Sequence, residues 1–152
     1  MKPLLAVAAL LCTVASVLFA QSPAVSPLVG AWRVTEMADG NGPPVTNPQP
    51  GLYVFTRQHY SFARINGTQP LPAYPSNDKA TDADKVAVFN ALYLNTGTYT
   101  VTGNTLATKA MVAKSAFAIG GAGNQYEFAI AGSTLTLTQK PAGAVIRLTR
   151  LE

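Results

Sequence analysis

The feature that most constrains this chain is a succession of short segments in which apolar and polar residues alternate, with turn residues between them. Residues 125–131 alternate in this way, and residues 134–138 repeat the pattern after the turn Gly132-Ser133. A two-residue alternation is typical of a β-strand that buries one face. Because strands joined by such short turns pair in an antiparallel sense, the sequence predicts a mainly β protein.

Eight such strands are expected between the linker that follows the N-terminal segment and the last residues. They span residues 28–37, 52–56, 59–65, 98–101, 105–111, 125–131, 134–138 and 144–151. Sequential antiparallel strands with one apolar face close into an up-and-down barrel or fold as two packed sheets. An eight-stranded barrel has an interior that side chains fill or that holds one small ligand.

One helix is predicted between the third and fourth strands, over residues 82–92. Thr81 is suited to cap it, and acidic residues follow in its first turn, where the helix dipole favours them. Three apolar residues at helical spacing predict a packing face. They are Val86, Phe89 and Tyr93. Asn95 and Gly97 are expected to end the helix.

Three irregular stretches are expected to be loops, and one of them, residues 68–77, contains three prolines. Residues 39–51 contain three glycines and four prolines, which exclude regular structure and predict a long loop over one end of the fold. A loop of this length is either a lid or binding loop or a plain connection. Residues 115–123 are small and rich in glycine, and we expect a loop there as well.

The N-terminus predicts an export signal. Lys2 is followed by uncharged apolar or small residues up to Ala20, so we expect a signal peptide over residues 1–20. A membrane anchor is the competing interpretation, and a lipid anchor on Cys12 is a further one, although the bulky Leu11 is poorly suited to that processing. Cleavage predicts an exported protein, periplasmic or secreted, with no stable membrane span. A linker over 21–27 then precedes a single domain over 28–152.

Composition argues against several classes of function. The only cysteine lies in the predicted signal peptide, and the chain has one histidine, so neither a disulfide, a metal site nor a bound cofactor is expected. The net charge is +4, or +3 without Lys2, but the basic residues are scattered along the chain. Because they form no basic stripe, nucleic-acid binding is not expected.

Several sequence elements together resemble a bacterial lipocalin-like domain family. They are Gly30-Ala31-Trp32, residues 51–56 followed by 59–61, residues 97–101, residues 135–138 and the closing 148–152. The resemblance implies an eight-stranded up-and-down barrel, into which the helix predicted above would be inserted between strands three and four. It also implies that Arg150 stacks on Trp32, beside Gly30, to close one end of the barrel. The chain departs from secreted vertebrate lipocalins in its mid-chain helix and in having no cysteine pair.

The resemblance and the aromatic strands together predict a binding protein for a small hydrophobic molecule held inside the barrel. The residues expected to line that site are Tyr53, Phe55, Tyr60, Phe62, Arg64, Tyr99, Tyr126 and Phe128, with Arg64 as a polar anchor. One alternative is an enzyme of the cyclase or isomerase type that acts on an apolar substrate through His59, Tyr60 or Arg64. Another is a structural envelope protein with a filled barrel.

Overall fold

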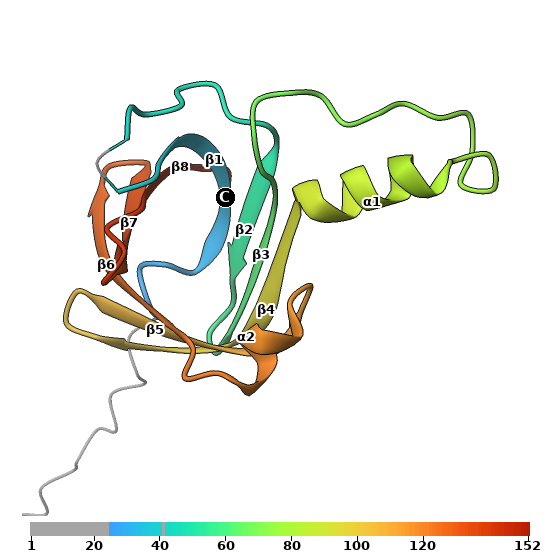
Figure 1. Ribbon diagram of the computed structural model, residues 1–152. Coiled ribbons are helices and arrows are strands. Elements are labelled where there is room, and N and C mark those ends of the chain that lie inside the picture. Colours follow the sequence, from blue (N-terminus) through green and yellow to red (C-terminus); the bar gives the residue numbers. More distant parts are fainter. Residues whose placement is uncertain (1–24, 41) are drawn as a thin grey trace, which may run out of the picture.

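The computed structural model describes residues 25–40 and 42–152, which form one closed antiparallel barrel (Figure 1). Each of the eight strands in this part of the chain pairs with its neighbours in sequence, and the last strand pairs with the first. The mainly β, up-and-down barrel expected from the sequence is therefore confirmed. The predicted signal peptide over 1–20 lies outside the described residues, as does most of the predicted linker.

The strands follow the alternating segments of the sequence. They are β1 (Gly30–Ala38), β2 (Gly51–Phe55), β3 (His59–Ile65), β4 (Leu92–Thr102), β5 (Thr105–Ala113), β6 (Asn124–Ala131), β7 (Thr134–Lys140) and β8 (Val145–Arg150). The helices are α1 (Asp82–Ala91) and α2 (Ala116–Gly120). The bounds of every strand except β4 lie within two residues of the prediction, because turn residues mark where the pairing stops.

Strand β4 begins at Leu92, directly after α1, and not at residue 98 as the sequence predicts. The residues expected to end the helix belong to this strand. Asn95 is buried on the inner face of the barrel, where its side chain accepts a hydrogen bond from Tyr60. Gly97 lies at an irregularity in the pairing with β5, where a Cβ would collide with the carbonyl oxygen of Lys109. Close backbone approach, and not helix termination, explains this glycine.

Helix α1 is capped as predicted, but it packs differently. Thr81 and Asp84 form a reciprocal capping box. The predicted apolar face is wrong: α1 has no buried residue, and Val86 and Phe89 are 57% and 56% exposed. The helix extends away from the barrel wall (Figure 1), and Tyr93 belongs to β4, where it packs against the core.

The segment between β5 and β6 is also not the plain loop that was predicted. It contains the short helix α2, so the prediction of a single helix is corrected to two among the described residues. Alanine favours the helical conformation, and this outweighs the small-residue character of the segment over a single turn. Within the described residues, no helix has the length and apolar character needed to cross a membrane.

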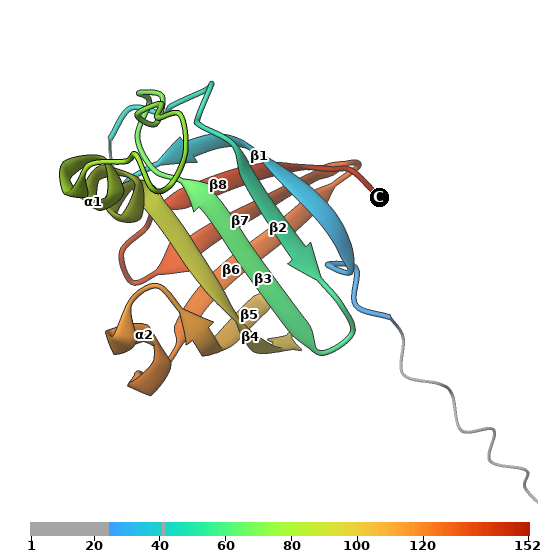
Figure 2. The same cartoon turned by 90° about the vertical axis from the view of Figure 1, so that its right-hand side faces the viewer.

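The barrel has two different ends (Figure 2). At the loop end lie the long connections between β1 and β2, between β3 and β4, and between β5 and β6, with both helices. At the hairpin end lie the tight turns around residues 57, 103 and 132, together with residues 25–29 before β1. The core extends from the hairpin end toward the loop end. Its largest fully buried side chains are Trp32, Tyr53, Phe55, Phe62, Leu28, Leu106, Leu135, Leu137 and Leu148.

Candidate functional site: the loop end of the barrel

The hairpin end is sealed around Trp32. The guanidinium of Arg150 lies 4.0 Å over the Trp32 ring and donates to the carbonyl oxygens of Pro27 and Val29 at 2.7 and 2.9 Å. The indole nitrogen donates to the carbonyl oxygen of Leu28 at 2.8 Å. A cation over an indole face is attractive, and the carbonyls satisfy its donors. This is the pairing of Arg150 with Trp32 that the resemblance implied.

Gly30 is essential to the same closure. Its φ of +135° lies outside the region that side chains usually adopt, and a Cβ there would collide with the carbonyl oxygen of Glu152. The backbone at the end of the chain therefore approaches β1 closely and covers this end of the barrel.

Above this plug the interior is packed with aromatic rings. Phe62 is central: its ring stacks on Tyr53 with centroids 4.0 Å apart, and Tyr60 lies 4.6 Å away. Phe55 and Tyr126 meet Phe62 edge-on at 5.4 and 6.2 Å. These are the separations of rings in direct contact. The rings predicted to line a ligand site are thus in contact with one another.

The remaining predicted aromatic residues complete this packing. Tyr99 meets Phe55 edge-on at 5.4 Å and donates its hydroxyl to the carbonyl oxygen of Thr56 at 2.7 Å. Phe128 is half-buried and packs against the core from β6. Tyr60 donates to the side-chain oxygen of Asn95 at 2.5 Å. The buried hydroxyls of Tyr60 and Tyr99 therefore form hydrogen bonds within the protein.

Arg64 lies at the boundary between the packed interior and the loop end. It is on the inner face of β3, two residues beyond Phe62, and it is half-buried. Its guanidinium lies 3.9 Å from the Tyr93 ring centroid, donates to the Tyr53 hydroxyl at 2.7 Å and donates to the Asn66 side chain at 3.1 Å. These neighbours orient the cation without neutralising it.

No carboxylate lies within ion-pair distance of Arg64 among the described residues. The three ion pairs there join Lys85 to Asp82, Lys140 to Glu127 and Arg147 to Glu36. A half-buried guanidinium usually acquires a carboxylate partner, because desolvation of an unpaired charge is costly. Arg64 therefore offers an uncompensated positive charge at the loop end.

The phenols around Arg64 remain neutral. Burial raises the pKa of Tyr53 to about 12, and this effect exceeds the opposing influence of the nearby Arg64 charge. Burial also raises the pKa of Tyr126, with further contributions from Tyr93 and Tyr53. Because a neutral phenol still carries its proton, the cluster combines hydroxyl donors with one fixed cation. Such a set suits an anion better than it suits proton abstraction.

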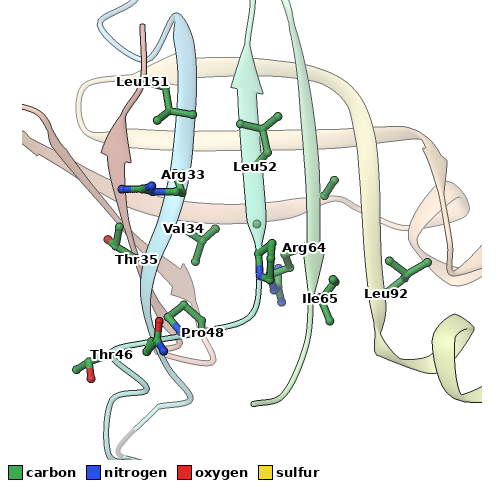
Figure 3. A pocket seen from close by; sticks show the side chains of 14 residues that line it. Arg33, Val34, Thr35, Thr46, Pro48, Leu52, Arg64, Ile65, Leu92 and Leu151 are labelled. Carbon is green, nitrogen blue, oxygen red and sulfur yellow. The ribbon is translucent and has the colours of Figure 1, made fainter. Parts of the chain in front are cut away.

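Two hollows adjoin Arg64. The larger, here called the outer groove, has a volume of about 790 Å³ and runs along the outside of β1, β2 and β3 (Figure 3). Its apolar walls include Leu52, Ile65 and Leu92, and it is bounded by residues 46–50. The smaller, here called the mouth hollow, has a volume of about 490 Å³ and lies under the loop 39–50. Arg64 and Pro48 line both hollows.

Of the eight residues predicted to bind a ligand, Arg64 is the one that lines these two hollows. The other seven are Tyr53, Phe55, Tyr60, Phe62, Tyr99, Tyr126 and Phe128, and they form the packed interior beneath it. Sequence reasoning missed the groove walls because Leu52 and Ile65 point outward. Exposed single apolar residues on a barrel are ordinary and gave no signal.

The residues proposed for catalysis do not converge. His59 is exposed at the start of β3, whereas Arg64 is near the opposite end of the same strand. Tyr60 is buried between them and engaged with Asn95. No group of three residues that could hold a metal ion is present in the part of the chain that the structure describes.

An up-and-down barrel of eight strands, plugged at one end by a tryptophan beneath an arginine, has the lipocalin-like fold. The comparison with one solved structure agrees. A lipocalin-like protein from Bacteroides uniformis superposes with a TM-score of 0.50 at 12% identity, over 82% of this chain and 98% of that one. An uncharacterized protein from Bacteroides eggerthii gives a TM-score of 0.49 at 10% identity, over 81% and 98%. No family model and no curated protein matches the sequence.

Proposed function

We propose that the protein binds a small hydrophobic molecule at the loop end of its barrel, without catalysing a reaction on it. The observation that supports this is the pair of adjoining hollows that share Arg64 and Pro48. Concave, mostly apolar sites with a few convergent polar groups are the usual sites of small ligands. The lipocalin-like fold is compatible with such a role.

Because the interior is packed with aromatic rings, we infer that the ligand binds nearer the loops than the sequence suggested. Arg64 is the predicted residue that a ligand in either hollow would contact, and Tyr53 would lie directly behind it. Phe55, Phe62 and Tyr126 would form the floor of the site and support it. A deeper position would require the stacked rings of Tyr53 and Phe62 to separate, with the loss of their mutual contact.

Fluorescence titration with an apolar dye and with labelled fatty acids tests this proposal. We expect saturable binding with one molecule per chain. The variant Pro48→Asp, which places a charge in the wall common to both hollows, is expected to weaken binding. Gln58→Asp, in the β2–β3 turn at the hairpin end, is the matched control. If no apolar probe binds saturably, the proposal is wrong.

The packed interior also favours a second candidate, a structural envelope protein with a filled barrel. Stacked rings at 4.0 Å leave no room for a guest between them. This candidate predicts no saturable binding by any small apolar probe, together with retention on a partner protein through the loop 39–50. The same titration therefore separates the two functions.

The proposed setting is outside the cytoplasm. This part of the proposal rests on the signal peptide expected over residues 1–20 and on no structural observation. The intact mass of the protein purified from the organism that encodes it tests the expectation. A chain beginning at Gln21 or within a few residues of it would support export, whereas a chain that retains Met1 would oppose it.

A further inference from the structure

The barrel wall has a seam between β1 and β2. The two strands pair only where Gly30–Arg33 face Leu52–Phe55. Beyond Arg33, β1 continues toward the loop end, but β2 does not begin until Gly51. On that side of β1 the described contact is a single bridge from Met37 to Val45. Figure 3 shows the two strands diverging, with the segment that contains Pro48 crossing between them.

Side chains, and not backbone hydrogen bonds, close this seam. Val34 and Arg64 approach it from the inner face, and a Cβ added to Gly51 would lie 2.7 Å from Val34 Cγ2 and 2.9 Å from Arg64 Cβ. The outer groove is lined by these three residues and also by residues that point outward. The groove therefore extends from the outer surface of the barrel to Arg64, whose side chain belongs to the inner face.

The two parts of the groove have different chemistry. At the inner part, Arg64 has no carboxylate partner among the described residues. The Tyr53 hydroxyl accepts from Arg64 and helps to orient its guanidinium. At the outer part, apolar side chains line the groove beside the exposed Arg33. They include Leu52, which is 45% exposed, together with Ile65 and Leu92. The arginines match an anion, and these apolar side chains match a hydrocarbon.

We propose that the seam binds an amphipathic monoanion, with its carboxylate on Arg64 and its apolar chain lying along the outside of β2 and β3. This inference rests on the proposed function and adds the chemical class of the ligand and its position across the barrel wall. A guanidinium supplies parallel donors for one carboxylate.

A matched pair of probes tests the class of ligand. The probes are a dansyl-labelled undecanoic acid and its methyl ester, which differ in charge but share the apolar chain. We expect the acid to bind the unmodified protein about tenfold or more tightly than the ester, as expected for a charge-assisted hydrogen bond. Arg64→Met should remove this preference, whereas Arg57→Met, at the hairpin end, should keep it.

The outcomes separate this inference from the proposed function. If the acid and the ester bind equally well to the unmodified protein, the inference is overturned and the proposed function stands. If neither binds, both are overturned. The comparison of the two probes on the unmodified protein needs no variant, so a folding defect of Arg64→Met leaves the test intact.

A second pair of variants tests the position. Leu52→Asn changes the outer wall of the groove, and Val45→Asn changes the mouth hollow, at similarly exposed sites. We expect Leu52→Asn to weaken binding of the acid about fivefold, from the loss of apolar contact area, and Val45→Asn to leave it unchanged. The reverse result would place the ligand in the mouth hollow and would overturn the proposal that it binds at the seam.

Discussion

At the residue scale, two arginines on the inner face of the barrel have opposite roles. Arg150 is engaged by the Trp32 ring and by carbonyl oxygens, so its charge serves the closure of the hairpin end. Arg64 is held by a phenol, an amide and the Tyr93 ring, none of which carries a negative charge. The difference in partners, and not the residue type, distinguishes a structural cation from a binding one.

Arg150 is expected to be important for stability. Arg150→Met removes the cation–π contact and leaves the carbonyl oxygens of Pro27 and Val29 without their donor. We expect the free energy of unfolding to fall by about 2–4 kcal/mol. Arg150→Lys should recover little of it, because an ammonium lacks the planar set of donors. Urea unfolding measures this change.

The control for this prediction lies on the same strand. Arg147 pairs with Glu36 on the outside of the barrel. Arg147→Met is expected to cost less than about 1 kcal/mol, as is usual for exposed ion pairs. Equal losses for Arg150→Met and Arg147→Met would contradict the role assigned to the Trp32 stack.

The buried Tyr53 phenol is expected to lower the free energy of unfolding as the pH becomes alkaline. Its pKa is about 12 in the folded protein, against an ordinary value of 10.0 that applies to the unfolded chain. The folded state therefore retains the proton where the unfolded state has lost it, and the contribution is intact below about pH 10. Between about pH 10 and pH 12 we expect the free energy of unfolding to fall by about 2–3 kcal/mol from this group.

The variant Tyr53→Phe isolates that effect. It removes the hydroxyl and its hydrogen bond to Arg64 at every pH, but it should also lower the slope of stability against pH by up to one proton in this window. Urea unfolding at a series of pH values measures the slope. An unchanged slope in Tyr53→Phe would show that the phenol ionises as easily in the folded protein as in the unfolded chain.

At the scale of elements, α1 is an appendage of the barrel. It has no buried residue, and it is attached by its junction with β4, by the Asn66 backbone N–H, which donates to the carbonyl oxygen of Ala91 at 2.7 Å, and by Lys114. Lys114 donates to the carbonyl oxygens of Phe89 and Asn90 at 3.0 and 3.3 Å, and its ammonium lies 5.0 Å from the Phe89 ring centroid. A cation at the C-terminus of a helix satisfies its last carbonyls. Contacts with the rest of the protein therefore hold the C-terminal end of α1, whereas its N-terminal end is stabilised by its own capping box.

Hydrogen exchange is expected to reveal this weak attachment. The amides of α1 should exchange at least about tenfold faster than those in the centre of β4, because they open without unfolding the barrel. Thr81→Ala should speed their exchange further, whereas the global free energy of unfolding should change by less than about 0.5 kcal/mol. Exchange in α1 as slow as in β4 would contradict this description.

The errors in predicting the elements have a common physical cause. Asn95 and Gly97 have the local character of helix terminators, but their reasons are tertiary: one satisfies a buried tyrosine, and the other permits close approach of β5. Val86 and Phe89 have helical spacing, but no apolar element covers them and both stay more than half exposed. Periodicity reports which side chains share a face, and it cannot report whether another element covers that face.

At the scale of the whole molecule, the barrel was largely predictable. Eight alternating segments separated by short turns leave few topologies, and the Trp32–Arg150 pairing joins the first strand to the last. The candidate site was predictable only in part. Arg64 followed from the inward alternation of β3, but the outer groove arises where β1 and β2 diverge, and that divergence depends on pairing register that no single segment encodes.

The central claim has two parts. Side chains fill the barrel interior toward the hairpin end, and a ligand binds near the loop end, at the seam between β1 and β2. Amide NMR of the isotope-labelled protein, titrated with the dansyl-labelled acid, tests it most directly. We expect shifts to be confined to residues 33–35, 46–52 and 63–65, whereas amides beside the buried Phe55, Tyr99 and Leu135 remain unchanged. Saturable shifts centred on those interior residues, or no shifts at saturating probe, would contradict it.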